Sequence, residues 1–135
     1  MIKTFIDTSF LIALVNEKDK DHARAVELSL LYENLSLLTT DCILLEIGNS
    51  LARNFRREAV ETINNFLFSE EIEVVSLNRN LFDRAFELYQ TRKDKTRGLV
   101  DCVSFTVMRE REVVDALTND RHFQQAGFNA LLRDD

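Results

Sequence analysis

The sequence predicts an α/β fold in which helices cover both faces of a mostly parallel sheet of four to five strands. Short runs of β-branched and aromatic residues alternate with segments whose apolar residues recur at helical spacing. Helix-starting residues stand between the two kinds of segment. The chain of 135 residues contains three glycines and no proline, which favours long elements joined by short, plain loops. We therefore expect a single domain over residues 1–135.

The predicted strands are short apolar runs, and the first of them precedes Asp7, Thr8 and Ser9, which favour the start of a helix. In chain order the predicted strands cover residues 2–6, 36–40, 72–77, 113–118 and 128–132. Strands that alternate with helices favour parallel pairing with right-handed connections. In such sheets the functional site lies beyond the carboxyl ends of the strands, where the strand order reverses.

Helices are predicted where apolar residues recur every three or four positions, as Leu44, Ile47 and Leu51 do. The predicted helices begin with the apolar run 10–14 and continue with 19–34, 41–53, 58–68, the segment after the capping residue Asn78, 99–109 and 120–126. The segment 91–97 is the most basic stretch, and we expect it to be an exposed loop.

Composition and spacing exclude several classes of function. The glycines stand too far apart for a dinucleotide-binding fingerprint or a phosphate-binding P-loop. Cys42 and Cys102 lack the paired spacing of a zinc site, so we expect free, packed thiols in a reducing compartment. The net charge of −6 argues against indiscriminate binding of polyanions. The apolar run near the N-terminus is too short for a signal core or a membrane span, so we expect a cytoplasmic protein with no membrane partner.

Acidic residues at the ends of predicted strands and helices are candidates for a site. Asp7 follows the first strand and Asp120 follows the fourth, so their carboxylates converge if these strands are neighbours. Taken alone, each is also an ordinary helix N-cap. Asp101 opens the helix 99–109 between apolar neighbours, which favours an inward orientation, although a carboxylate in the first turn also suits the helix dipole.

Glu46 lies within the apolar segment 43–47, where a buried carboxylate needs a partner or a cation. Its neighbours at helical spacing include Cys42, Asn49 and Ser50, a small and polar face that suits the lining of a pocket. Alternatively, Glu46 occupies the solvated edge of an amphipathic helix. Periodicity alone does not separate these two interpretations.

Four carboxylates at close range repel one another unless a divalent cation neutralises them. Oxygen ligands suit Mg²⁺ or Mn²⁺, which activate water and offset charge on a phosphate. Metal-assisted hydrolysis of a phosphodiester bond is the chemistry that this arrangement supports. A phosphotransfer enzyme with Asp7 as nucleophile is less favoured, because Ser9 stands where a second acid would act as acid and base.

At these acids the sequence resembles the PIN-domain ribonucleases, and among them the VapC-type toxins of toxin-antitoxin systems. The matching motifs lie in register over almost the whole chain, at residues 5–14, at Thr40 and Glu46, at 98–105 and at 116–128. The resemblance implies a three-layer α/β/α sandwich and a Mg²⁺- or Mn²⁺-dependent endoribonuclease that cuts RNA. It also implies a homodimer and inhibition by a cognate VapB-type antitoxin.

The resemblance assigns residue roles position by position. The acidic metal site, which is also catalytic, matches Asp7, Glu46, Asp101 and Asp120. Supporting hydroxyls match Thr8, Ser9 and Thr118. Family members differ in whether a further acid follows the fourth, and here His122 stands nearby instead, which leaves a second metal position open.

Basic residues supply a candidate rim for RNA contacts, namely Arg53, Arg56, Arg57, Arg92, Lys93, Lys95 and Arg97. His22 and His122 are expected on the surface or in packing, because a hard cation favours oxygen donors. Asp115 interrupts a predicted strand, and an edge or turn position is the one physical reason that the sequence offers for it. The alternative to a nuclease is a non-catalytic binding or regulatory module of the same fold that holds a structural cation.

Overall fold

The computed structural model describes residues 3–91 and 96–133. Strands in these ranges form one sheet in the order β3-β2-β1-β4-β5, and every neighbouring pair is parallel. The strands are β1 (Thr4–Ile6), β2 (Leu37–Thr40), β3 (Ile72–Val75), β4 (Asp115–Leu117) and β5 (Asn129–Ala130). The predicted parallel sheet is confirmed, and each strand is shorter than the apolar run that predicts it.

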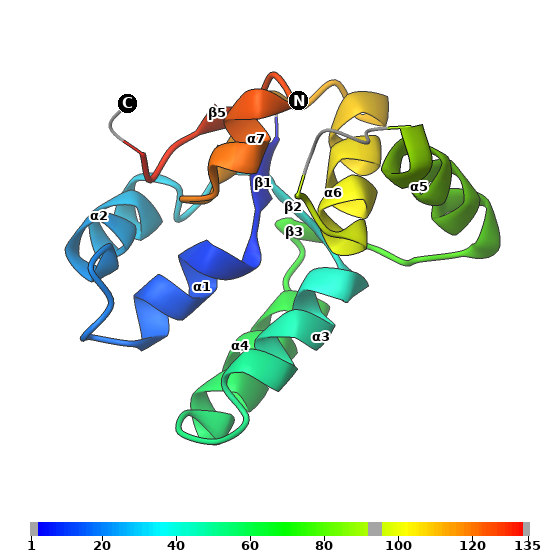
Figure 1. Cartoon of the computed structure of the whole chain (residues 1–135). Coiled ribbons are helices and arrows are strands. Elements are labelled where there is room, and N and C mark those ends of the chain that lie inside the picture. Colours follow the sequence, from blue (N-terminus) through cyan, green and yellow to red (C-terminus); the bar gives the residue numbers. More distant parts are fainter. Residues whose placement is uncertain (1–2, 92–95, 134–135) are drawn as a thin grey trace.

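Helices connect these strands and form the outer layers (Figure 1). They are α1 (Thr8–Val15), α2 (His22–Leu31), α3 (Asp41–Ser50), α4 (Arg56–Phe68), α5 (Arg79–Thr91), α6 (Leu99–Glu110) and α7 (Arg121–Gln125). Helices α1 to α4 lie on one side of the sheet, and α5, α6 and α7 lie on the other (Figure 1). This arrangement confirms the three-layer α/β/α sandwich.

Local side-chain hydrogen bonds decide where two of the helices begin. Asn16 Oδ1 accepts from Lys18 N at 3.0 Å, and Asp19 Oδ1 accepts from Asp21 N at 2.9 Å. Such bonds compete with helix formation, so α2 begins at His22 and not at residue 19. The cap predicted at Asn78 is confirmed, because its Oδ1 accepts from Leu81 N at 2.8 Å.

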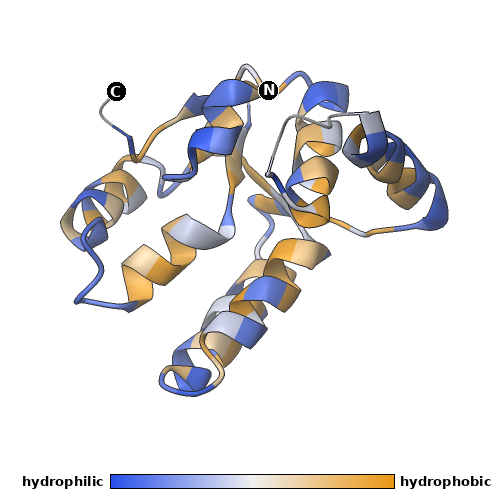
Figure 2. Ribbon diagram, in the orientation of Figure 1, coloured by the Kyte–Doolittle hydropathy of each residue, from blue (hydrophilic) through white to orange (hydrophobic). Residues whose placement is uncertain are grey.

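The core lies on both faces of the sheet. On one face the buried rings of Phe5 in β1 and Phe105 in α6 both pack against Phe123 in α7, with centroids 6.3 Å and 4.9 Å apart. On the other face α1 is apolar over nearly its whole length (Figure 2), as a helix covered by α2 and α3 requires. No helix in the described ranges is long and apolar enough to cross a membrane.

The predicted exposed loop at 91–97 is wrong at Arg97. This residue is only 4% exposed, because its guanidinium lies 5.1 Å from the centre of the buried Phe105 ring. Its three side-chain nitrogens are buried and have no hydrogen-bond partner among the residues that the structure describes. The other basic residues of the predicted loop, Arg92, Lys93 and Lys95, lie outside the described residues.

Two expectations about single residues are settled by packing. Cys42 and Cys102 are both buried, as predicted, and neither forms a disulfide bond. Asp115, for which the sequence offers only an edge or turn position, begins β4 and accepts from Asn129 Nδ2 of β5 at 2.8 Å. It therefore ties together the two strands at this edge of the sheet.

The strand order reverses between β1 and β4. From β1 the chain continues to β2 and β3 on one side, and it returns to β4 on the other. Ile6 pairs with Leu117, so the segments that leave these strands start side by side with Asp7 and Thr118. The predicted location of the functional site is this edge.

Candidate active site

An open cleft of about 670 Å³ lies at the point where the strand order reverses. Its lining includes all four predicted acids, which are Asp7, Glu46, Asp101 and Asp120. One follows β1, one lies within α3, one lies in the first turn of α6, and one is the N-cap of α7. The structure thus brings together side chains that only the fold makes neighbours.

Asp7 is the most buried of these acids, with 6% of its surface exposed. Its Oδ2 accepts from Thr118 Oγ1 at 2.7 Å and from Ser9 Oγ at 3.2 Å, and it makes no side-chain cap on α1. Burial raises the pKa of Asp7 to about 6, although the hydrogen bond from Thr118 acts in the opposite direction. The carboxylate is therefore directed toward the cleft by hydroxyl groups and does not serve as a helix cap.

Asp101 also has a raised pKa. Its side chain is 20% exposed, and desolvation, followed by the charges of Asp7 and Asp120, raises its pKa to about 7. The backbone of Gly98 and the ring of His122 act in the opposite direction. The predicted inward orientation is confirmed, because the carboxylate lines the cleft.

Glu46 combines the two interpretations that its sequence position allows. It is half-buried, it lines the cleft together with Ser50, and its Oε1 accepts from Thr8 Oγ1 at 2.6 Å. The hydroxyl of Thr8 thereby connects α1 to α3 across the cleft. The three predicted hydroxyls, Thr8, Ser9 and Thr118, all bond to one of the acids or to one another.

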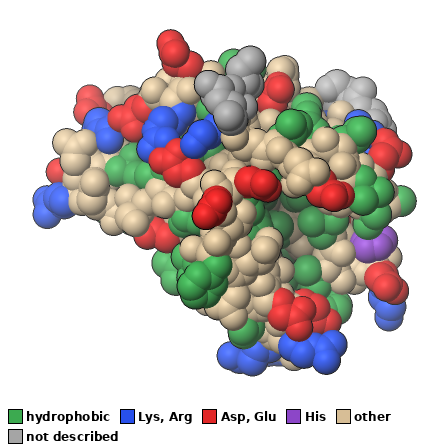
Figure 3. All heavy atoms as spheres, turned by 180° about the vertical axis from the view of Figure 1, so that it is seen from behind, with side chains coloured by type: hydrophobic (Ala, Val, Ile, Leu, Met, Phe, Trp, Pro, Cys, Tyr) green, Lys and Arg blue, Asp and Glu red, His purple; other side chains and the backbone are tan. Residues whose placement is uncertain are grey.

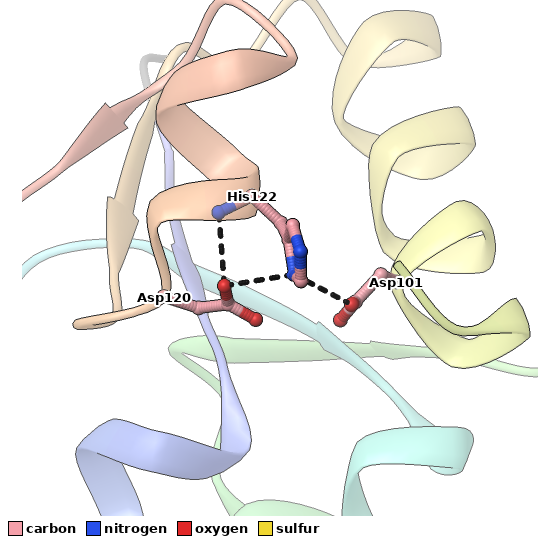
Figure 4. Close-up of side chains that lie close together, drawn as sticks. All are labelled: Asp101, Asp120 and His122. Carbon is pink, nitrogen blue, oxygen red and sulfur yellow. Dashed lines mark hydrogen bonds and ion pairs between the residues drawn. The ribbon is translucent and has the colours of Figure 1, made fainter. Parts of the chain in front are cut away.

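His122 is placed differently from its prediction as a surface or packing residue. Its Nδ1 lies 3.0 Å from Asp120 Oδ1 and 3.9 Å from Asp101 Oδ2 (Figure 4). Asp120 also caps α7 by accepting from the backbone N–H of His122 at 2.9 Å. The predicted packing role holds for His22, whose Nδ1 lies 2.7 Å from the carbonyl oxygen of Ala13.

Two arginines outside the predicted basic rim line the cleft. Arg121 and Arg133 line it, and Arg133 Nη1 donates to the carbonyl oxygen of Asn119 at 3.0 Å. Arg53 and Arg56 are exposed near the connection between α3 and α4, outside the lining of the cleft. Arg121 was not among the predicted RNA contacts, although its position directly after Asp120 is a sequence signal that could have identified it.

The donor set fits a divalent cation. Asp101, Asp120 and His122 offer ligand atoms that all lie within 4.8 Å of one another. The raised pKa values of Asp7 and Asp101 mean that, without a cation, the fold favours protonating these acids. A bound cation would favour their deprotonated forms, so metal binding and proton release are coupled here.

The comparisons with known proteins identify related chains that match over nearly the whole sequence. The PIN domain family matches residues 4–129. The 23S rRNA-specific endonuclease VapC20 of Mycobacterium tuberculosis, from two strains, is 29% identical over 124 residues, which cover 92% of this chain and 94% of the relative. The crystal structure of VapC20, described as a sarcin-ricin loop cleaving toxin, has a TM-score of 0.83 at 28% identity and covers 93% of this chain and 95% of its own.

Two further solved structures share the fold at lower identity. VapBC2 from Rickettsia felis, bound to a promoter DNA fragment, has a TM-score of 0.65 at 16% identity, and DNA-bound VapBC from Salmonella typhimurium has 0.64 at 16%. Both alignments cover 96% of each chain. Together with the family match, which includes all four acids of the cleft, these likenesses lead to one assignment: the chain belongs to the PIN domain family.

Proposed function

We propose that this chain is a metal-dependent endoribonuclease of the VapC toxin type. The observation that carries the proposal is the convergence of four carboxylates, from four separate elements, in one cleft at the switch point of the sheet. The 29% identity to an rRNA-specific endonuclease over nearly the whole chain supports the same reaction class.

The residues of the cleft divide into ligands and supports. Asp7, Glu46, Asp101 and Asp120 are the proposed ligands for Mg²⁺ or Mn²⁺. A bound cation supplies Lewis-acid chemistry, since it lowers the pKa of water and offsets charge on a phosphodiester group. Thr118 and Ser9 hold the Asp7 carboxylate, and Thr8 holds that of Glu46, so these acids keep fixed directions.

RNA is the proposed substrate, and Arg121 and Arg133 are the residues placed to contact its phosphates. They counter the negative charge of a cleft whose acids would otherwise repel a polyanion. The relative VapC20 is described as cleaving the sarcin-ricin loop, so the corresponding stem-loop of 23S rRNA is the first RNA to test.

Cleavage of that stem-loop by the purified, partner-free chain tests the proposal, with Mn²⁺, Mg²⁺ or EDTA in parallel. We expect cleavage that needs the metal. Asp7→Asn and Asp101→Asn should reduce it by more than the roughly 10–100-fold that loss of an outer-shell partner costs. Asp115→Asn is the matched control, because this aspartate bonds to Asn129 away from the cleft. Full cleavage by both cleft variants would contradict the proposal.

A non-catalytic module with a structural cation is the competing function. It predicts that metal raises the melting temperature of the wild-type chain and not of Asp7→Asn, while no RNA in a structured panel is cut under any condition. Metal-dependent cutting would exclude this alternative.

A VapB-type antitoxin is the proposed protein partner, as the names of the two VapBC structures suggest. A groove of about 310 Å³ between α1, α2 and α4 is lined by residues that include Leu14, Tyr32 and Phe66. Near it, Leu31 and Phe68 are 66% and 82% exposed, and Figure 3 shows hydrophobic side chains on this side of the molecule. Capture of a protein encoded beside this chain, lost in Phe68→Asp, is the expected result, and undiminished capture by the variant would contradict this surface.

A further inference from the structure

His122 lies beside the acids of the cleft and has no role among the proposed ligands and supports. Its ring lies between two carboxylates that come from different elements, Asp101 of α6 and Asp120 at the start of α7 (Figure 4). Nδ1 is the ring atom that faces both, at 3.9 Å and 3.0 Å, and the side chain is 21% exposed. A nitrogen atom thus occupies a position among oxygen donors at the edge of the cleft.

The ring is held in this orientation from the opposite side. His122 Nε2 lies 2.9 Å from Thr96 Oγ1, in the segment that leads into α6. When Nε2 carries the ring proton, Nε2 donates a hydrogen bond to this hydroxyl, and Nδ1 presents a lone pair to the two carboxylates. Three electron-rich atoms then face one another within 4.8 Å, an arrangement that is unfavourable until a cation sits among them.

We propose that His122 Nδ1 is a ligand of the divalent cation, beside Asp101 and Asp120, and that Thr96 is the outer-shell residue that orients the ring. This inference rests on the proposed metal-dependent function and adds a nitrogen to its oxygen ligands. Imidazole suits first-row transition ions better than it suits Mg²⁺. The site should therefore prefer Mn²⁺ to Mg²⁺ more strongly than four carboxylates alone would.

Pulsed EPR on the untagged full chain, loaded with Mn²⁺ in the absence of RNA, tests this directly. The chain contains two histidines, so a ¹⁴N coupling to the bound ion has few sources. We expect that coupling in the wild-type chain, its replacement by a ¹⁵N coupling after selective histidine labelling, and its loss in His122→Ala. His22→Ala is the matched control and should keep it, because His22 bonds to Ala13.

Metal affinity, read from the same EPR titration, gives a second measurement. Thr96→Val should weaken Mn²⁺ binding by roughly tenfold, as loss of an outer-shell partner does, and His122→Ala should weaken it further. The affinity for Mg²⁺, measured by competition with Mn²⁺, should fall less than the affinity for Mn²⁺ in both variants. His122→Asn serves as a second variant if circular dichroism shows that His122→Ala is unfolded.

The outcomes separate this inference from the function on which it rests. Mn²⁺ that binds without nitrogen coupling, or that binds more tightly to His122→Ala, would overturn the ligand role of His122 and leave the nuclease intact. A wild-type chain that binds no Mn²⁺ would overturn both.

Discussion

Asp7 is a buried carboxylate whose partners are hydroxyl groups. Thr118 donates to it at 2.7 Å and also accepts from the backbone N–H of Asp120 at 3.1 Å, so one hydroxyl positions two acids. Thr118→Val keeps the shape and removes this support. We expect Mn²⁺ affinity and cleavage to fall roughly 10–100-fold. Thr106→Val, which removes a hydroxyl that donates to the backbone of Cys102 within α6, is the control, and equal affinity in the two variants would contradict this role.

The raised pKa values make the stability of the metal-free chain depend on pH. Asp7 and Asp101 titrate near 6 and 7 in the folded state, compared with 3.8 ordinarily. Between about pH 4 and pH 7 the folded state therefore binds more protons than the unfolded state, so stability falls as pH rises through this window. Glu73, whose pKa the hydrogen bonds from Arg111 and Lys3 lower from 4.5 to about 2, acts in the opposite direction, but its effect is confined to pH values below about 4.5.

We accordingly expect the free energy of unfolding in EDTA to be lower at pH 8 than at pH 5. Mn²⁺ should restore much of it at pH 8, because the ion binds the deprotonated acids of the folded state only. Urea denaturation at both pH values measures this, and Asp101→Asn should flatten the dependence. Metal-free protein that becomes more stable toward pH 8 would refute the argument.

Arg97 is a buried cation whose nitrogens have no hydrogen-bond partner within residues 3–91 and 96–133. Its contact with the Phe105 ring offsets only part of the cost of removing the charge from water. We expect Arg97→Met, which keeps the apolar contact, to leave the free energy of unfolding unchanged or to raise it by about 1–4 kcal/mol. Urea denaturation measures the change in stability, and RNA affinity tests whether Arg97 contacts RNA. Lower RNA affinity of Arg97→Met at equal stability would place Arg97 in the RNA-binding surface, as the sequence predicted.

At the scale of an element, α5 depends on a cap that the sequence makes visible. Asn78 Oδ1 accepts from Leu81 N at the start of this helix, and α5 packs along α6, which carries Asp101. Asn78→Ala should cost about 1 kcal/mol of stability. Asn80→Ala removes a bond to the exposed Arg84 instead and should cost less. Equal thermal shifts in the two variants would mean that the cap contributes nothing.

Periodicity predicts these elements well because it reports which face of a helix or strand is buried. It places every strand and helix of the described chain, and it errs mainly at their ends. There the outcome depends on local bonds such as that of Asp19 to the backbone of Asp21, which stops α2 short of its predicted start. The two acids at strand ends also differ in a way that periodicity does not predict. The side chain of Asp120 caps its helix, and that of Asp7 does not.

The site was predictable where residue type restricts position and unpredictable where tertiary contacts decide it. Carboxylates at strand ends converge whenever the strands are neighbours, so Asp7 and Asp120 could be paired from sequence. An arginine side chain, in contrast, is found both exposed to solvent and packed over a buried ring. For Arg97 only the contact with Phe105 decides between these two environments. The placement of His122 likewise depends on Asp101 of a different helix.

At the scale of the whole molecule, the charge distribution sets how RNA binding responds to salt. The chain carries a net charge of −6, and four acids line the cleft. Non-specific affinity for nucleic acid comes from phosphate neutralisation by Lys and Arg, and within the described residues the cleft offers Arg121 and Arg133 for this purpose. Binding should therefore depend strongly on the divalent cation and only weakly on monovalent salt.

Each phosphate contact to single-stranded nucleic acid contributes about −0.7 to the slope of log affinity against log salt concentration, so two arginines predict a slope of about −1.4. Rapid-mixing fluorescence anisotropy with a labelled RNA, read at fixed Mn²⁺ before the RNA is cut, measures it. Arg121→Gln should make the slope shallower by about 0.7. A slope steeper than about −3.5 would require five or more contacts, which the cleft arginines cannot supply. It would assign RNA binding to a wider basic surface that includes Arg53 and Arg56, as the sequence first indicated.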